Sequence, residues 1–180
     1  HNTLSTTEDT AYTFTVSDFN FTDVDGDSLH HLTVVAKPGA GDLRLNGSRV
    51  GNGDTINVAD IVAGNLTYTP ATNGHGTGYT NFTFSVNDGT TNSATNYTLT
   101  VNVTAVNDAP TASDSTVNAT EDTAYVFTAS DFGFSDVDGN SLVNVLIDRL
   151  PGNGVLYLSR NAVNAGDRIS AADILSLIHI

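Results

Sequence analysis

The chain repeats itself at a fixed offset of 113 residues, and this repeat limits what the sequence can fold into. Residues 7–12 read TEDTAY, and residues 120–125 read the same. From Thr7 to Ile61 the two copies align without a gap and share about 30 identities at 55 positions. Self-similarity at a fixed period indicates two copies of one structural unit.

The two copies differ in length. We expect residues 1–108 to form a complete repeat and residues 109–174 to form the first part of a second, truncated one. After Ile174 the second copy reads LSLIHI, whereas the first continues as GNLTYTP over residues 64–70. Because LSLIHI also resembles the translation of an adapter used in sequencing libraries, we predict that residues 175–180 are a non-native tail.

Short groups of alternating apolar residues predict an all-β fold. Asn46 and Gly47 follow one of these groups and form a strong signal for a two-residue hairpin. Residues 58–62 could form one helical turn. About seven short strands with turn residues between them indicate an antiparallel β-sandwich of the immunoglobulin-like, Greek-key kind, with an up-and-down barrel as the alternative. The predicted strands of the first copy centre on residues 12–16, 32–34, 43–45, 66–68, 82–86 and 97–103.

The charge of the chain favours small cations over nucleic acid as partners. The formal net charge is -14, from 20 acidic and 6 basic residues, and a nucleic-acid backbone needs a basic surface. With no cysteine, only oxygen ligands could form a dense metal site. No apolar stretch approaches the roughly 20 residues that span a bilayer, so we expect no membrane insertion. No catalytic motif is visible, which predicts a protein that is not an enzyme.

Several acidic turns could hold a cation. In the segment DVDGD, Asp23 and Asp25 lie two residues apart, so their carboxylates can converge while Gly26 bends the backbone. The turns at residues 87–89 and 107–110 each place an amide oxygen beside a carboxylate. Each pattern also fits an ordinary turn in which aspartate binds its own backbone. In contrast, His30 and His31 are adjacent on a predicted strand, so they should point to opposite faces.

Together these segments resemble a known family. The run FTFSVNDG over residues 82–89 and VNDAP over residues 106–110 look like the closing half of a cadherin repeat, and DVDG over residues 136–139 looks like its DxD segment. The combination of TEDTAY and DVDG resembles the cadherin-like repeats of large secreted bacterial adhesins of the RTX type. The resemblance implies Ca²⁺ at the junction of two repeats, held by Glu8, Asn107, Asp108, Asp136 and Asp138. It also implies that Asp23, Asp25 and Asp88 meet at the opposite pole, with Glu121 as the second copy of Glu8.

The leading hypothesis is therefore a calcium-binding, non-catalytic extender module of a large secreted or surface-anchored bacterial protein. Its expected partners are the neighbouring repeats of the same protein and either a glycan or a protein outside the cell. Two alternatives stay open at this point. The sandwich could bind a polysaccharide through its Asn, Thr and Tyr side chains, or it could be a spacer that needs no cation.

Overall fold

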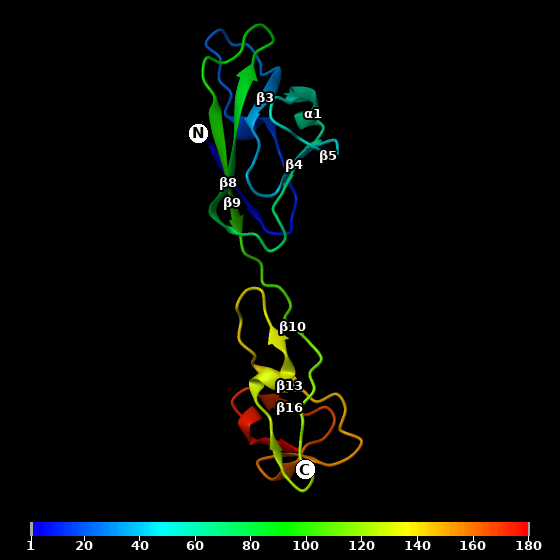
Figure 1. The fold of residues 1–180 in the computed structure, drawn as a ribbon. Coiled ribbons are helices and arrows are strands. Elements are labelled where there is room, and N and C mark those ends of the chain that lie inside the picture. The colour runs from blue at the N-terminus through cyan, green and yellow to red at the C-terminus, as the bar shows by residue number, and fades with distance from the viewer. Residues whose placement is uncertain (1, 180) are drawn as a thin grey trace. The chain divides into compact units, whose positions relative to one another are not determined.

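The computed structural model describes residues 2–179, which divide into two compact units after Val106. Strands dominate both units, and the one α-helix within the described residues is α1 (Val58–Val62). The predicted all-β fold is therefore confirmed, as is the helical turn at residues 58–62 (Figure 1). No helix among residues 2–179 combines the length and the apolar character that a membrane span needs.

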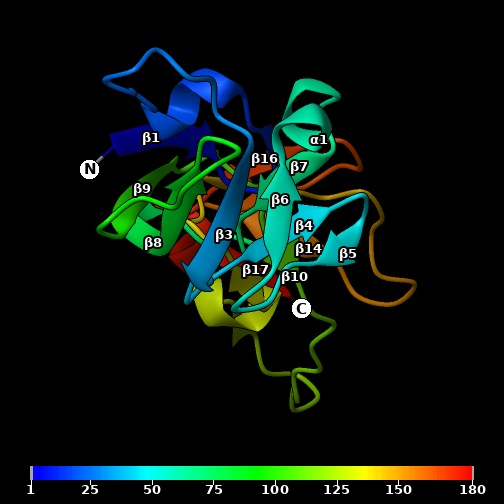
Figure 2. The same cartoon turned by 90° about the horizontal axis from the view of Figure 1, so that it is seen from above.

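The first unit is built from two sheets. The larger sheet has the order β1-β9-β8-β3-β6, and the smaller has the order β2-β7-β4-β5. In the larger sheet β1 runs parallel to β9, whereas β8 runs antiparallel to both β9 and β3. Figure 2 shows β6 beside β3 at the edge of this sheet. The strands are β1 (Asn2–Thr7), β2 (Tyr12–Thr13), β3 (His31–Ala36), β4 (Asp42–Leu45), β5 (Ser48–Arg49), β6 (Thr55–Asn57), β7 (Leu66–Thr69), β8 (Gly76–Asn87) and β9 (Tyr97–Thr104).

The two sheets share one hydrophobic core. Alternate residues of the long strands β8 and β9 are buried, as the period of two predicts, and the larger sheet contributes Phe82, Phe84 and Leu99, each at most 1% exposed. The smaller sheet contributes Leu66 and Tyr68, both fully buried. Burial of each such side chain stabilises the unit by about 1.5–3 kcal/mol. The sandwich predicted from the alternation is thus present in the first unit.

Local turn chemistry explains where the prediction held and where it was wrong. The hairpin at Asn46 and Gly47 is confirmed, because both residues have positive φ (51° and 79°) and join β4 to β5. The strand predicted over residues 12–16 ends at Thr13 instead. Asp18 accepts a hydrogen bond from the Thr15 amide at 2.7 Å and starts the 3-10 helix η1 (Val16–Phe19). The strands β1 and β6 were missed because their apolar alternation is weak.

The second unit holds shorter strands around a smaller core. Its largest sheet has the order β11-β17-β14-β15, and two further pairs are β10-β12 and β13-β16. The core consists of Ile147, Leu156, Val163, Ile169, Ile174 and Leu177. The elements are β10 (Thr111–Ala112), β11 (Tyr125–Val126), η2 (Ala129–Phe132), β12 (Phe134–Ser135), β13 (Asn144–Leu146), β14 (Leu156–Leu158), β15 (Asn161–Ala162), β16 (Arg168–Ser170), η3 (Ile174–Ser176) and β17 (Leu177–His179).

Of the segment predicted as a tail, residues 177–179 form strand β17, in the position that β7 takes in the first unit, and residue 180 lies outside the described residues. The Phe127 amide donates to the Leu177 carbonyl at 3.0 Å, as the Phe14 amide donates to Leu66 at 3.0 Å. Leu177 is 1% exposed and so completes this side of the core. In contrast, residues 115–120, the counterparts of β1, form no strand. In the first unit β1 pairs with β9, and no strand of residues 107–179 takes the place of β9.

Candidate metal centre

Glu8 is a buried carboxylate at the end of β1. The parallel pairing with β9 continues past the strand, since the Glu8 amide donates to the Thr104 carbonyl at 3.0 Å. This brings the Glu8 side chain, which is 2% exposed, next to the last residues of the first unit. Its Oε1 accepts the Val106 amide at 2.7 Å, and its Oε2 lies 3.1 Å from His75 Nδ1. Both oxygens therefore have a partner within the first unit.

These contacts favour the charged form of Glu8. The hydrogen bond from the Val106 amide lowers the pKa of Glu8, and the contact with His75 lowers it further, although burial acts in the opposite direction. Glu8 is thus a carboxylate with its charge held inside the protein. Such a group is suited to binding a cation.

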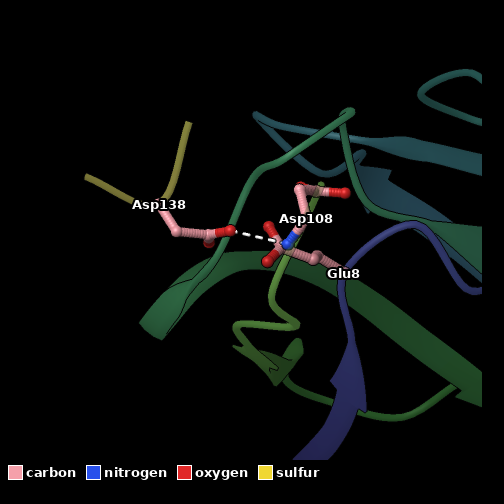
Figure 3. A group of neighbouring side chains, drawn as sticks. All are labelled: Glu8, Asp108 and Asp138. Atoms are coloured by element: carbon pink, nitrogen blue, oxygen red, sulfur yellow. Dashed lines mark hydrogen bonds between the residues drawn. The ribbon is translucent and has the colours of Figure 1, made fainter. Parts of the chain in front are cut away.

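Asp138 plays the corresponding part in the second unit. Its Oδ2 accepts the Asp108 amide at 2.7 Å, as the dashed line in Figure 3 shows. The DVDG turn that carries it is organised by Asp136, whose Oδ1 accepts the amides of Asp138 and Asn140 at 3.0 Å each. Gly139 allows this turn because its φ is 76°. The Asx-turn expected from sequence therefore orients the Asp138 carboxylate.

The start of the second unit is joined to this turn by a further contact. Asn140 Nδ2 donates to Asn107 Oδ1 at 2.8 Å. Asn107, Asp108, Asp136 and Asp138, four residues that sequence reasoning assigned to the junction, are thus brought together within the second unit. Glu8 lies in the first unit and holds the residue that immediately precedes Asn107.

The donor set fits a hard divalent cation such as Ca²⁺. Carboxylate and amide oxygens keep lone pairs after accepting one hydrogen bond, and Ca²⁺ takes 6 to 8 oxygen ligands. Asp108 and Asp138 would supply carboxylate oxygens, and Asn107 would supply an amide oxygen. There is no cysteine in the chain to favour a softer metal. Bound at such a site, the cation would neutralise the carboxylates.

The other predicted ligands lie in separate turns. Asp23 Oδ1 accepts the amides of Asp25 and Asp27 at 2.8 and 3.2 Å. Asp88 Oδ1 accepts the amides of Thr90 and Thr91 at 2.7 Å each, and these bonds lower the pKa of Asp88.

The contacts of Asp23 stay within the loop at residues 23–27, and those of Asp88 stay within the loop at residues 88–91. The predicted meeting of Asp23, Asp25 and Asp88 at one pole therefore stays a prediction. Glu121, the counterpart of Glu8, is exposed.

Two features of the histidines were not foreseen. His75 approaches Glu8 from a turn 67 residues away, and no local pattern in the sequence could have signalled this contact. His30 and His31 were predicted to point to opposite faces, which is wrong. Their Nδ1 atoms lie 3.1 Å apart, because His30 precedes β3 and is not bound by the alternation of that strand.

Comparison with known proteins places the first unit. A family described as cadherin-like matches residues 1–105, a range that includes Glu8 and every strand from β1 to β9. The match covers more than half of the chain. Searches for similar curated proteins and for similar solved structures found no match.

Proposed function

The chain belongs to the cadherin-like family, and from this premise we propose that it is a calcium-binding, non-catalytic extender module of a large secreted or surface-anchored bacterial protein. Family membership supports a role in adhesion or extension, in the extracellular space where such domains usually act. Calcium binding and the bacterial adhesin context are the parts that the proposal adds.

One observation carries the proposal: two carboxylates accept hydrogen bonds from backbone amides that lie two residues apart in the sequence. Glu8 of the first unit accepts the hydrogen bond of the Val106 amide, and Asp138 of the second unit accepts that of the Asp108 amide. The segment between these two amides contains Asn107, whose amide oxygen is itself fixed by Asn140. A carboxylate of each unit is therefore hydrogen-bonded to the short segment that connects the two units. This supports a cation-binding role for the connecting residues 106–108.

In the proposed mechanism, a bound cation removes the repulsion between carboxylates and makes the linker stiffer. Without a cation, like-charged carboxylates such as those of Asp108 and Asp138 repel one another, and the linker is free to turn. A bound Ca²⁺ neutralises them and replaces repulsion by shared coordination. The linker then has one favoured geometry, and a tandem array of such units becomes an extended rod. No step requires a chemical reaction, in keeping with a non-catalytic module.

Calorimetric titration of the 180-residue chain with Ca²⁺ tests the proposal. We expect binding with a Kd of about 10⁻⁴ to 10⁻³ M, the range of extracellular calcium modules. Asp138→Asn should weaken it at least tenfold, because it removes a charged ligand. Asp114→Asn is the matched control, since it makes the same charge change at an exposed residue with no assigned role. Absence of binding, or equal loss in both variants, would overturn the proposal.

A further inference from the structure

Two histidine side chains of the first unit converge at the start of β3. His30 and His31 are adjacent in the chain, and their Nδ1 atoms lie 3.1 Å apart. The ring centroids are 5.4 Å apart and the ring planes meet at 76°, so the rings are edge to face and not stacked. His30 is exposed and His31 is half-buried, so solutes in the solvent can reach the pair. The pair is separate from the residues of the candidate calcium site.

The backbone that carries the pair is fixed by neighbouring strands. The His30 amide donates to the Asn87 carbonyl at 2.8 Å, and the His30 carbonyl accepts the Val58 amide at 3.0 Å. His31 lies opposite Asn57 of β6 on one side and opposite Asn87 of β8 on the other. The sheet therefore sets the positions of both residues. Such preorganisation lowers the entropic cost of bringing two ligands to one ion.

The turn after β8 leaves space for the His30 ring. A Cβ added to Gly89 would lie 3.9 Å from the Cβ, Cγ and Cδ2 atoms of His30, which is an ordinary van der Waals distance. The turn is thus next to the carbon edge of the ring. The Nδ1 atom of His30 is near His31 instead. The nitrogen that could bind an ion is therefore not covered by this turn.

The two Nδ1 atoms have the spacing that a chelated metal ion requires. Imidazole nitrogens bind Zn²⁺ at about 2.0–2.1 Å. An ion at this distance from two atoms 3.1 Å apart makes an N–metal–N angle of about 100°, between the square-planar and the tetrahedral value. Neutral imidazole binds Cu²⁺, Ni²⁺ and Zn²⁺, whereas Ca²⁺ and Mg²⁺ prefer oxygen ligands. Among residues 2–179, no further His, Asp or Glu lies close enough to complete a set of three with the pair, so water would fill the other positions.

The pair belongs to the first unit and not to the repeat. At the offset of 113 residues its counterparts are Val143 and Asn144. Asn144 begins β13 as His31 begins β3. The second unit therefore has the same local strand without an imidazole pair. This also indicates that valine and asparagine are compatible with the backbone at these two positions.

We propose that His30 and His31 form a chelating site for a divalent transition-metal ion, which both Nδ1 atoms bind and water completes. Each ring presents the lone pair of Nδ1 to the ion and carries its proton on Nε2. In the usual order of affinities Cu²⁺ binds more tightly than Ni²⁺ or Zn²⁺. The site differs from the proposed calcium site in its ligands and does not depend on it.

Calorimetric titration of the untagged 180-residue chain with Cu²⁺ tests the proposal. Excess Ca²⁺ is present throughout, so that the result does not depend on the proposed calcium site. His30→Val and His31→Asn should each weaken the tightest Cu²⁺ binding by about tenfold or more, because the second imidazole of a chelate binds within the same molecule. The control is His179→Asn, which removes a histidine of β17 and keeps the pair. Its affinity should be unchanged. Unchanged affinity in His30→Val or His31→Asn, or an equal loss in the control, would overturn the proposal.

Nuclear magnetic resonance of the unmodified chain locates the ion without relying on the folding of a variant. As Zn²⁺ is added in the same buffer, the imidazole signals of His30 and His31 should shift together and reach saturation at the same Zn²⁺ concentration. The signals of His179 should stay in place over that range. A shift of only one of the two imidazoles, or of neither, would contradict chelation by the pair.

Discussion

Glu8 Oε1 accepts the amide hydrogen of Val106 at 2.7 Å, although the two residues are 98 positions apart in the chain. The bond closes the first unit on itself, because it ties the end of its first strand to its last residue. It also places a fixed negative charge beside the segment that leads into the second unit. Stability of the first unit and cation binding should therefore both depend on this carboxylate.

Replacement of Glu8 should separate these two roles. Glu8→Gln keeps an oxygen that can accept the Val106 amide, whereas Glu8→Ala leaves the amide without this acceptor. We expect the thermal midpoint of the first unit to fall more for alanine than for glutamine, while calcium affinity falls in both. Thermal unfolding followed by circular dichroism, with calorimetry for calcium, measures the two effects. Equal midpoints for the two variants would contradict a structural role of the bond.

The stability of the first unit should decline in acid. The pKa of Glu8 is lower in the folded chain than its unfolded value of about 4.3. A lowered pKa stabilises the folded state above the unfolded pKa, and this contribution is lost as the pH falls through the folded pKa. The lowered pKa of Asp88 acts in the same direction. We expect urea midpoints to be constant from pH 7 to about pH 5 and to fall below that. Glu8→Gln should flatten the decline.

The aromatic packing of β8 should account for much of the stability of the first unit. Phe84 is 1% exposed and contacts the rings of Phe19, Phe82 and Tyr97. Phe84→Ala should cost about 3–5 kcal/mol in urea unfolding, from lost burial and from the cavity left behind. Val62→Ala is the control, because Val62 is 75% exposed and should change stability by about 0.5 kcal/mol or less. Similar values for both would contradict the packing described.

Gly41 should tolerate no side chain. Its φ is 72°, and an added Cβ would meet the Tyr68 hydroxyl and come within 2.6 Å of the Thr69 carbonyl. The same hydroxyl donates to the Ala40 carbonyl at 2.9 Å, so it cannot move without losing that bond. Gly41→Ala should therefore destabilise the first unit by more than about 1 kcal/mol. Gly47→Ala is the comparison, since its φ is also positive but its surroundings are open. A larger loss at Gly47 would contradict the steric argument.

How far the sequence predicted the fold depended on the range of the interactions involved. Alternation of residues such as Phe82 and Phe84 is local, so it revealed the strands and the core face directly. The strand β1 was not predicted, because its pairing with β9 joins residues about 97 positions apart and its own apolar alternation is weak. The internal repeat, which is visible only when distant parts of the chain are compared, indicated that Glu8 and Glu121 occupy equivalent positions.

The candidate site could be predicted in part for the same reason. Asp136 and Asp138 lie in a short turn with its own local hydrogen bonds, so the motif alone indicated their geometry. The contact between Glu8 and His75 depends on the tertiary fold, so no local sequence pattern predicts it. The change of β2 into η1 after Thr13 was also missed, because the capping aspartate Asp18 overrides the apolar alternation there.

Calcium should raise the thermal stability of the chain by mass action. A ligand that binds only the folded state adds about 2.7 kcal/mol at a concentration of 100 times its Kd. We therefore expect the unfolding midpoint to rise by several degrees from chelator to saturating Ca²⁺, and Asp138→Asn to reduce this rise. Magnesium at equal concentration provides the control for ionic strength. A spacer that needs no cation would melt at the same temperature in every case.

The width of the distance distribution between two spin labels tests the stiffening most directly. The chain has no cysteine, so labels can be placed at the exposed positions Val62→Cys in the first unit and Val126→Cys in the second. Pulsed electron paramagnetic resonance then records the distances between them with chelator and with saturating Ca²⁺. We predict a broad distribution without calcium that narrows when calcium binds, and no such narrowing in Asp138→Asn. A distribution of equal width in both conditions would contradict calcium stiffening of the junction.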